Sequence, residues 1–568
     1  MERSRGWTGV ALGVAVAALA LRLYDLDLRS ISHPEVYVPG IPLPPVHSVP
    51  PPRLTWSEAL WMHFHDEPHP MGWYLAMFLW TGLAGVSEWA LRLPSAVLGA
   101  ASVWLAFALG RRSYSASAGA LAASLLALHG FHLFLSQTAR MYAAGTFFGL
   151  LATALLIAFV YGSGRRRLSG AGYVLSVLAT AGSVEFVWPL LGIHILWATL
   201  VLPMRPFRWS DLPRARFSGA HPAIQLQALA VMVSAPELLH SIYRARHGAV
   251  EQRALEFLRE YLSFGFLFAT DRSEMPVLSV PMAAGVVLLV VGLGLIAWGG
   301  VTRACKPQPS DGAGDLPRWL PPLVALIASG FMVWLASIAL YRNEALMVVS
   351  TGPVLALWLP ALARAVAHVL TRSRAFVRWR ARSAGPRLLV VLLGLAAPLA
   401  LFVLSAKVAI LANRAFLIFL PYLVILVAGA LAGIGPRLPR LGATVAMIGV
   451  FAASVPYSFT KPGAPNDYKS LVMAMMPHYR PDDLILVLDK AWVEAPFFYY
   501  LPDAHYAFTD YDAVLRDNPG ARIWLVTWPY EDMPVVSDAR REALAAYRRE
   551  QHVTARRASA ELFLPPGG

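Results

Sequence analysis

One polar segment near the start of the chain gathers the residue types that can do chemistry. It lies between two apolar stretches, from about 26 to 70, and it places Glu35 in ISHPEVYVPG. A linker between two helices needs only a few residues. Carboxylates and imidazoles can move protons, bind a metal ion or hold a phosphate, so this segment is the first candidate for a functional site. Its second half, HFHDEPHPMGWY, adds five such side chains: His63, His65, Asp66, Glu67 and His69.

Two kinds of site are open to these residues. A carboxylate could act as a general base; Glu35 is the first choice, with Asp66 or Glu67 as the alternative. His65, Glu67 and His69 are residue types that bind zinc or another divalent ion, but their spacing matches no standard metal motif. We therefore assign no cofactor and keep a divalent metal as an alternative, beside the plain reading of a solvated loop.

The composition indicates a membrane protein. Of 568 residues, 57% are hydrophobic and 14% are charged, whereas soluble domains average about 45–50% and about 25%. Apolar runs of about 17–25 residues recur along the chain, each long enough to cross a ~30 Å hydrocarbon core. The sequence therefore predicts a polytopic α-helical membrane protein.

The basic residues are placed as membrane topology requires. The net charge is +14, and arginines cluster in short loops such as Arg111-Arg112 and Arg165-Arg166-Arg167. Such clusters mark the cytoplasmic side of membrane proteins. The positive charge therefore indicates how the protein is oriented among the membrane lipids, and it does not indicate a nucleic-acid partner. The only cysteine is Cys305, which excludes an intrachain disulfide.

Loop charge then gives a topology. A retained signal anchor leaves the N-terminus cytoplasmic and the segment 26–70 outside, and the short apolar stretch 71–86 rests at the outer interface. A second outer loop at 240–276 is expected to carry an amphipathic interfacial helix. About thirteen transmembrane helices make up residues 1–457. Twelve spans follow the anchor, near 91–110, 117–135, 141–161, 171–184, 187–203, 222–240, 277–300, 319–341, 346–363, 388–406, 414–434 and 441–457.

The last part of the chain, 458–568, is soluble in character and predicts a small extracytoplasmic α/β domain. Helical and strand-like patterns alternate along it. We expect helices at 467–479, 494–501 and 537–551, the last capped by Ser537, and strands at 483–489 and 521–528.

The order of motifs in the first third resembles a known superfamily. LRLYDLDLRSIS is followed by HPMGWYLAMFLW, then SEWALRLPSAVLGAASVWLAFALGRR, then LHGFHLFLSQTARMYAAGTFF. This is similar to the GT-C glycosyltransferases that use polyprenyl-phosphate sugars, among them protein O-mannosyltransferases and transferases of aminoarabinose and lipopolysaccharide-core sugars. The similarity covers residues 1–160 well and 413–500 moderately. It implies a GT-C-like transmembrane domain and an inverting displacement, in which a carboxylate takes the acceptor proton and the lipid phosphate leaves.

The resemblance also implies site residues. His69 matches the histidine of an H-P-P motif, Arg140 and Tyr142 match the end of S-Q-E-A-R-M-Y, and Arg414 matches a later arginine. These four would bind the substrate or its phosphate, and an arginine at a span end that does not snorkel is by default functional. Arg92 ranks below them. The chain departs from the family at three positions: Pro34 precedes Glu35 where the family has D-E, Met71 replaces a proline, and Thr138 replaces a glutamate.

The function that these observations favour is transfer of a sugar from a polyprenyl-phosphate donor to a hydroxyl acceptor (glycan, lipid or protein). It would occur on the extracytoplasmic face of the plasma membrane. A lipid or glycan transporter or flippase and a non-catalytic relative are the alternatives. Transporters commonly carry internal repeats and polar residues at midplane depth. Here no repeat is evident and the polar residues gather at one face, which favours the enzyme.

Overall fold

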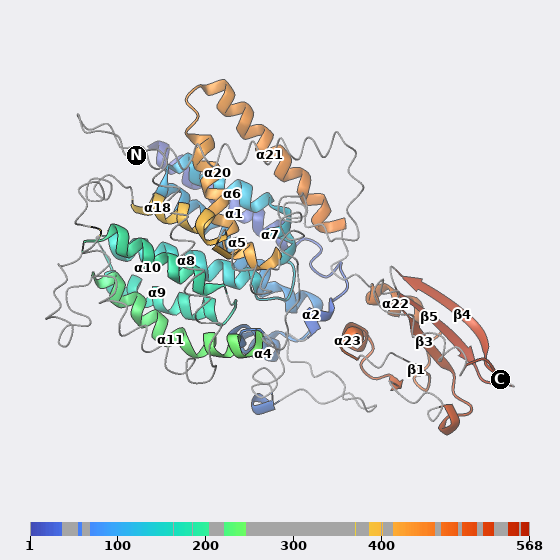
Figure 1. Ribbon diagram of the computed structural model, residues 1–568. Helices are drawn as coiled ribbons and strands as arrows, with labels where there is room; N and C mark the ends of the chain where they lie inside the picture. The colour runs from blue at the N-terminus through green and yellow to red at the C-terminus, as the bar shows by residue number, and fades with distance from the viewer. Residues whose placement is uncertain are drawn as a thin grey trace, which may run out of the picture.

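The computed structural model describes most of the helical part and most of the C-terminal part of the chain (Figure 1). The described residues are 2–36, 55–58, 69–162, 164–184, 186–203, 221–245, 370, 385–398, 400–401, 413–460, 467–486, 491–507, 515–527, 544–555 and 558–566. The expected spans at 277–300, 319–341 and 346–363 and most of the second outer loop lie outside them.

Apolar helices form the first part of the fold, as the sequence predicts. Four helices of the described part are long and apolar enough to cross a membrane: α1 (Glu2–Leu23), α5 (Glu88–Ser113), α8 (Tyr142–Tyr161) and α21 (Arg437–Thr460). The chain is a polytopic helical membrane protein, and the count of about thirteen spans stays a prediction. Further helices of this part are α9 (Arg166–Ala181), α10 (Val187–Val201), α11 (Pro222–Ala245), α18 (Gly385–Val391) with the π-helix η3 (Leu392–Ala396), and the 3₁₀-helix η4 (Asn413–Ile418) with α20 (Leu420–Ala432). The shorter helices α2 (His33–Val36), α4 (Met71–Ala84), α6 (Ala116–Leu128) and α7 (Gly130–Ser136) are described below with the features that they form.

Local sequence explains where the site-bearing helices begin. Ser87 precedes α5, and its hydroxyl accepts the Ala90 N–H at 3.2 Å, which caps the helix. α4 (Met71–Ala84) follows Pro70 and has 14 residues, a length of about 21 Å at 1.5 Å per residue. This is shorter than a ~30 Å hydrocarbon core, as expected of a helix that rests at the interface.

The expected single span 117–135 is wrong in one respect, because it is broken. α6 (Ala116–Leu128) and α7 (Gly130–Ser136) meet at 64° at His129, whose backbone is extended. Serines of α21 hydrogen-bond to the backbone at the break. The Ser454 hydroxyl accepts the Gly130 N–H at 3.0 Å, and the Ser458 hydroxyl donates to the Gly130 carbonyl at 2.9 Å. The bend sets the direction in which the chain enters the segment after α7.

A five-stranded sheet with order β2-β1-β3-β5-β4 forms the C-terminal region, by which we mean residues 467–566. β1 runs parallel to β2 and β3, whereas β5 is antiparallel to β3 and β4. α22, β1 and β3 lie within the segments where the sequence predicts them, whereas α23 overlaps the predicted helix 494–501 but begins three residues earlier. The elements are α22 (Tyr468–Met475), β1 (Leu484–Leu486), α23 (Ala491–Tyr500), β2 (His505–Ala507), β3 (Ile523–Thr527), β4 (Arg548–Ala555) and β5 (Ala558–Leu564).

The helix expected at 537–551 is wrong where the structure describes it. Leu544 begins a turn, and β4 begins at Arg548. β4 pairs with β5 from Arg548↔Leu564 to Ala555↔Ala558. Backbone pairing with a neighbouring strand overrides the local helical pattern of the sequence.

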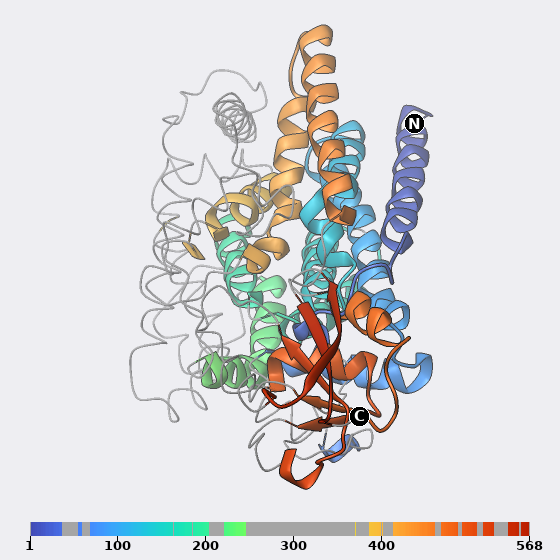
Figure 2. The same ribbon diagram turned by 90° about the vertical axis from the view of Figure 1, so that its right-hand side faces the viewer.

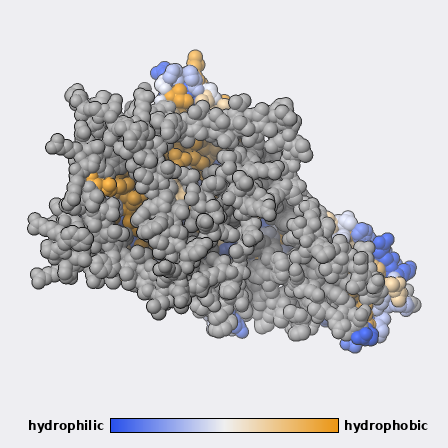
Figure 3. All heavy atoms as spheres, viewed as in Figure 1, coloured by the Kyte–Doolittle hydropathy of each residue, from blue (hydrophilic) through white to orange (hydrophobic). Residues whose placement is uncertain are grey.

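The C-terminal region lies at one end of the helical bundle and the N-terminus at the other (Figures 1 and 2). The helices enclose one large apolar core, and α22, α23 and the sheet enclose a separate core. In Figure 3, apolar side chains show over the described helices and hydrophilic ones over the C-terminal region, as expected if the helices face lipid and the sheet faces water.

Candidate functional site

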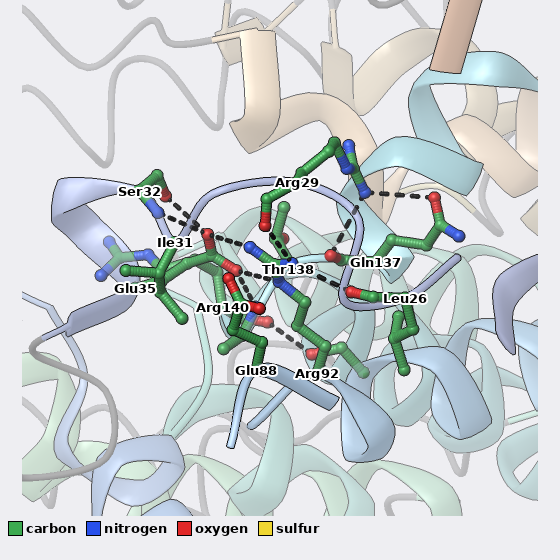
Figure 4. Close-up of polar contacts among 12 residues, drawn as sticks. Leu26, Arg29, Ile31, Ser32, Glu35, Glu88, Arg92, Gln137, Thr138 and Arg140 are labelled. Atoms are coloured by element: carbon green, nitrogen blue, oxygen red, sulfur yellow. Dashed lines mark hydrogen bonds and ion pairs between the residues drawn. The ribbon is translucent and has the colours of Figure 1, made fainter. Parts of the chain in front are cut away.

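The chain forms a compact loop directly after α1, which we call the loop segment 26–35. It begins after Asp25, whose φ of 46° reverses the chain direction, and it ends in the short helix α2 (His33–Val36). Its neighbours are the start of α5 and the connector 137–141 between α7 and α8. Figure 4 shows that the polar side chains of these three segments point toward one another.

Glu35 and Arg92 form the centre of the cluster. Arg92 Nε donates to Glu35 Oε1 at 2.9 Å and its Nη2 to Oε2 at 3.1 Å, with both side chains 1% exposed. Glu35 also accepts the Ala139 N–H at 2.8 Å, and the Ser32 N–H and hydroxyl at 2.9 and 2.8 Å. The carboxylate therefore joins α5, the connector and its own loop.

Arg92 also fixes the loop backbone. Its Nη1 donates to the carbonyls of Leu26 and Arg29, both at 2.9 Å, and its Nη2 donates to the Ser30 carbonyl at 3.1 Å. A planar guanidinium can serve several acceptors in one plane, which a lysine cannot do. Sequence reasoning ranked Arg92 low, yet its guanidinium donates hydrogen bonds to Leu26, Arg29, Ser30 and Glu35 of the loop (Figure 4).

The environment of Glu35 determines its charge. Burial alone would raise the pKa of this carboxyl. The Arg92 charge and the hydrogen bonds from Arg92, Ala139 and Ser32 outweigh burial and lower the pKa of Glu35 to about 2. Glu35 is therefore a firmly ionised partner of Arg92 and a weak proton acceptor.

The connector 137–141 ties α1 to the site. Gln137 Nε2 donates to the Tyr24 carbonyl at 3.0 Å and to the Arg22 carbonyl at 3.3 Å, which covers the end of α1. Its Oε1 and its backbone carbonyl both accept from Arg29 Nη2, at 3.1 and 3.3 Å. Thr138, where the family has a glutamate, donates its hydroxyl to the Leu135 carbonyl at 2.9 Å.

Arg140, the arginine of SQTARMY, lies beside α4. Its side chain is 6% exposed, and its Nη1 donates to the Tyr74 hydroxyl at 2.9 Å. Its backbone carbonyl accepts the Ser95 hydroxyl at 3.1 Å. Tyr74 belongs to HPMGWY, so the structure brings together two motifs that lie 66 residues apart in the chain.

Contacts with Gly182 and Glu237 hold the beginning of α4 and thereby place Tyr74. The Trp73 N–H donates to the Gly182 carbonyl at 2.7 Å, and Gly72 approaches Gly182 so closely that a Cβ would lie 2.8 Å from its Cα. The Met71 N–H donates to Glu237 Oε1 at 2.6 Å. The end of α9 and the second half of α11 therefore set the position of α4.

Arg29 is a functional candidate that sequence reasoning missed. It is 6% exposed, its guanidinium lies 4.8 Å from the Phe134 ring centroid, and its Nη1 has no hydrogen-bond partner among the described residues. Burial and the charge of Arg92 lower the pKa of Arg29 to about 9, while Glu35 opposes this effect. Its position within LRLYDLDLRSIS, one of the segments that resemble the family, was the available signal.

One buried charge at the loop segment has a donor without a partner among the described residues. Arg92 is paired with Glu35. Arg29 is 6% exposed and its Nη1 makes no hydrogen bond among the described residues. A buried charge is costly unless it has a partner, so Arg29 favours an anionic ligand.

The other residues proposed from the sequence are placed less closely. His69 lies half-buried directly before α4, and buried Tyr142 begins α8. Arg414 belongs to η4 by its backbone. His65, Asp66 and Glu67 lie outside the described residues. Within the described ranges, no group of three or more His, Cys, Asp or Glu side chains could hold a metal ion, so the metal alternative stays a hypothesis about the residues before 69.

A family model supports the resemblance seen in the motifs. The model described as dolichyl-phosphate-mannose-protein mannosyltransferase matches residues 66–144, from HPMGWY to SQTARMY. The chain thus resembles the GT-C polyprenyl-phosphate-dependent glycosyltransferases. No curated protein sequence matches the chain.

Solved structures of membrane glycosyltransferases align along most of the chain. ArnT from Cupriavidus metallidurans bound to undecaprenyl phosphate is 14% identical with a TM-score of 0.40, over 98% of each chain. AglB from Archaeoglobus fulgidus, an oligosaccharyltransferase with an inhibitory peptide and dolichol-phosphate, is 12% identical with a TM-score of 0.44, over 97% of this chain and 74% of its own. The mycobacterial arabinofuranosyltransferase AftD is 14% identical with a TM-score of 0.41, over 98% of this chain and 41% of its own.

Proposed function

We propose that this protein is an integral membrane glycosyltransferase that moves a sugar from a polyprenyl-phosphate donor to a hydroxyl acceptor, with inversion. The reaction would take place on the extracytoplasmic face of the plasma membrane, with the loop segment 26–35 and the C-terminal region on that face. The observation that carries the proposal is Arg29, whose Nη1 is a buried donor without a partner among the described residues, in contact with Gln137 of the SQTARMY motif that the mannosyltransferase family model matches. A glycan, a lipid or a protein could supply the acceptor hydroxyl.

The lipid phosphate would bind between Arg29 and Arg140. Arg29 Nη1 is a buried donor without a partner among the described residues, and the Tyr74 hydroxyl accepts a hydrogen bond from Arg140 Nη1. Guanidinium groups suit phosphate oxygens, and they would stabilise the charge that develops as the phosphate leaves. His69, Tyr142 and Arg414 are further candidates for the substrate site.

A carboxylate must take the acceptor proton, and the contacts of Glu35 argue against giving it this task. Five hydrogen bonds reach its two oxygens, and its pKa is about 2. We therefore assign Glu35 to holding the loop and assign the base to Asp66 or Glu67, in the same outer loop. A base works best when its pKa is near the working pH, which a strongly ion-paired carboxylate cannot offer.

The test is turnover of lipid-linked sugars by the purified protein in lipid nanodiscs. A panel of polyprenyl-phosphate sugars would be incubated with the protein, and release of polyprenyl phosphate followed by mass spectrometry. We expect one donor to be consumed, and Arg140→Met to lower that rate by about a hundredfold, because a charged donor to the leaving phosphate is lost. The matched control is Arg112→Met. Arg112 is exposed in the last turn of α5, at the other end of the helix from Arg92 and the loop segment.

Two results would contradict the proposal. Movement of a lipid-linked sugar between leaflets without its consumption would favour the flippase. Binding of polyprenyl phosphate without turnover of any donor would favour a non-catalytic relative. The base assignment has its own outcome: full activity in both Asp66→Asn and Glu67→Gln, with loss in Glu35→Gln at unchanged thermal stability, would return that task to Glu35.

A further inference from the structure

We infer that the C-terminal region is part of the transfer site, because Lys469 and Tyr500 hold the loop segment 26–35 in place through contacts that Arg92 does not make. The inference rests on the proposed function for its consequence in catalysis. The contact itself does not depend on that function, and it can be measured separately.

Tyr500, the last residue of α23, contacts the loop through its hydroxyl group. The hydroxyl accepts the Ile31 N–H at 2.6 Å and donates to Glu88 Oε1. One oxygen thus satisfies a loop amide and a carboxylate on α5 at once. Burial first, and then the charge of Glu88, raise the pKa of Tyr500, so the hydroxyl keeps the proton that it donates. Tyr499, its neighbour, donates to the Val86 carbonyl at 2.5 Å.

Lys469, near the start of α22, makes the second contact. Its Nζ donates to Glu88 Oε2 at 2.5 Å and to the Asp27 carbonyl at 2.6 Å, and its backbone N–H donates to the Ser30 hydroxyl at 3.4 Å. Glu88 is 8% exposed and therefore needs partners for its charge. The carboxylate receives them from two helices of the C-terminal region.

The two sets of contacts divide the loop backbone between them. Arg92 takes the carbonyls of Leu26, Arg29 and Ser30, whereas the C-terminal region takes the Asp27 carbonyl and the Ile31 N–H. Glu88 lies one helical turn before Arg92 on α5, so both sets meet on the same helix face.

Between the two sets lies Arg29, which we propose as a phosphate donor, and the loop ends at Glu35. A site that must orient charged groups depends on such support from packed neighbours. Lys469 and Tyr500 are thus positioning residues: they act on the substrate through the loop and do not touch it. The C-terminal region would couple its own placement to the geometry of the lipid phosphate site.

Hydrogen exchange tests the contact without reference to catalysis. The full-length protein in nanodiscs would be compared with Tyr500→Phe, Lys469→Met and Lys469→Arg. We expect amide exchange in the peptide that contains residues 26–35 to become about tenfold faster in Tyr500→Phe and Lys469→Met. In these variants, local opening of the loop no longer has to break the hydrogen bonds to the C-terminal region, so it costs less free energy. Lys469→Arg keeps a donor to Glu88 and should restore most of the protection.

The matched control is Tyr506→Phe. Tyr506 is 6% exposed in the core of the C-terminal region, and its hydroxyl donates to the Leu501 carbonyl, away from the loop. The same atom is removed there without touching residues 26–35, so exchange in that peptide should not change. Equal exchange in Tyr500→Phe, Lys469→Met and the wild type would overturn the inference.

Kinetics then tests the positioning role. For the donor that the wild type consumes, we expect Tyr500→Phe and Lys469→Met to lower kcat about tenfold with KM changed less than about threefold, since a misplaced loop weakens transition-state contacts most. If the wild type consumes no donor, the proposed function is wrong, and binding of undecaprenyl phosphate is measured instead of turnover. In that case we expect Tyr500→Phe and Lys469→Met to bind it about threefold or more weakly than the wild type. Faster exchange with kcat and this affinity both unchanged would overturn the positioning role.

Discussion

Glu35 and Arg92 form a buried ion pair, with Oε1 2.9 Å from Nε, that joins the loop segment 26–35 to the beginning of α5. Neither side chain reaches solvent to more than 1% of its surface. Charges of this kind stay buried only where hydrogen bonds meet nearly all of their donors and acceptors. Here the loop carbonyls, the Ala139 N–H and Ser32 meet them, so the pair works as a structural joint of the site.

Removing one charge of this pair should destabilise the protein strongly. Glu35→Gln keeps the shape of the side chain but leaves Arg92 buried without its counterion, at a cost of about 3–5 kcal/mol. We expect a clear fall in the thermal unfolding temperature in nanodiscs. The control is Glu58→Gln, because Glu58 is exposed and bonds only to nearby Thr55 in the described part of the chain. Equal unfolding temperatures for the two variants would show that the pair is not needed for stability.

The same pair predicts how stability depends on pH. The pKa of Glu35 is lowered from 4.5 to about 2, so the folded state binds this proton less well than the unfolded state. The stabilisation is therefore fully present above about pH 4.5 and is lost as the pH falls toward 2, with a total of about 3 kcal/mol. Unfolding by denaturant at a series of pH values would measure it. Glu35→Gln lacks the titrating group and should lose less stability than the wild type over this range.

Much of the fold could be predicted from the sequence because its signals are local. Apolar length located α5 and α8, and Ser87 with Pro70 marks where α5 and α4 begin. The break at His129 could not be predicted, because serines of α21, more than 300 residues away, make it possible. β4 was missed for a similar reason, since its partner β5 decides its conformation.

Motifs predict the candidate site, and the geometry changes the role that we propose for Glu35. Sequence reasoning named Arg140 and Glu35, and both lie in the cluster of Figure 4. It gave Glu35 the role of base because the sequence shows a charge but not its partner. The contact with Arg92 crosses 57 residues, and the contact of Tyr500 with Ile31 crosses 469. No spacing rule reaches such pairs, which is why the positioning residues emerge only from the structure.

Tyr74 should orient Arg140 toward the lipid phosphate. Tyr74→Phe removes the hydroxyl that accepts from Arg140 Nη1 at 2.9 Å and leaves the ring, whose centroid lies 6.0 Å from the Arg140 guanidinium carbon. We expect affinity for undecaprenyl phosphate to fall about threefold to tenfold, as for loss of one ordinary hydrogen bond, because Tyr74 acts on the phosphate only through Arg140. Fluorescence titration in nanodiscs would measure it, with Tyr506→Phe as the control. Unchanged affinity would show that Arg140 takes its place without Tyr74.

The approach of α4 to the end of α9 requires glycine at position 72. A Cβ there would lie 2.8 Å from the Gly182 Cα and 2.9 Å from its carbonyl oxygen, and backbone atoms cannot turn aside as a side chain can. Gly72→Ala should therefore push α4 outward and weaken the bond from the Trp73 N–H to Gly182, at a cost of about 1–3 kcal/mol. Gly13→Ala on α1 is the control, since nothing in the described structure lies within 4 Å of a Cβ at that position. Because Tyr74 lies two residues beyond Gly72, the variant should also lose affinity for undecaprenyl phosphate, whereas Gly13→Ala should keep both its stability and its affinity. A Gly72→Ala protein with wild-type unfolding temperature and affinity would mean that the interface with α9 can open without moving the site.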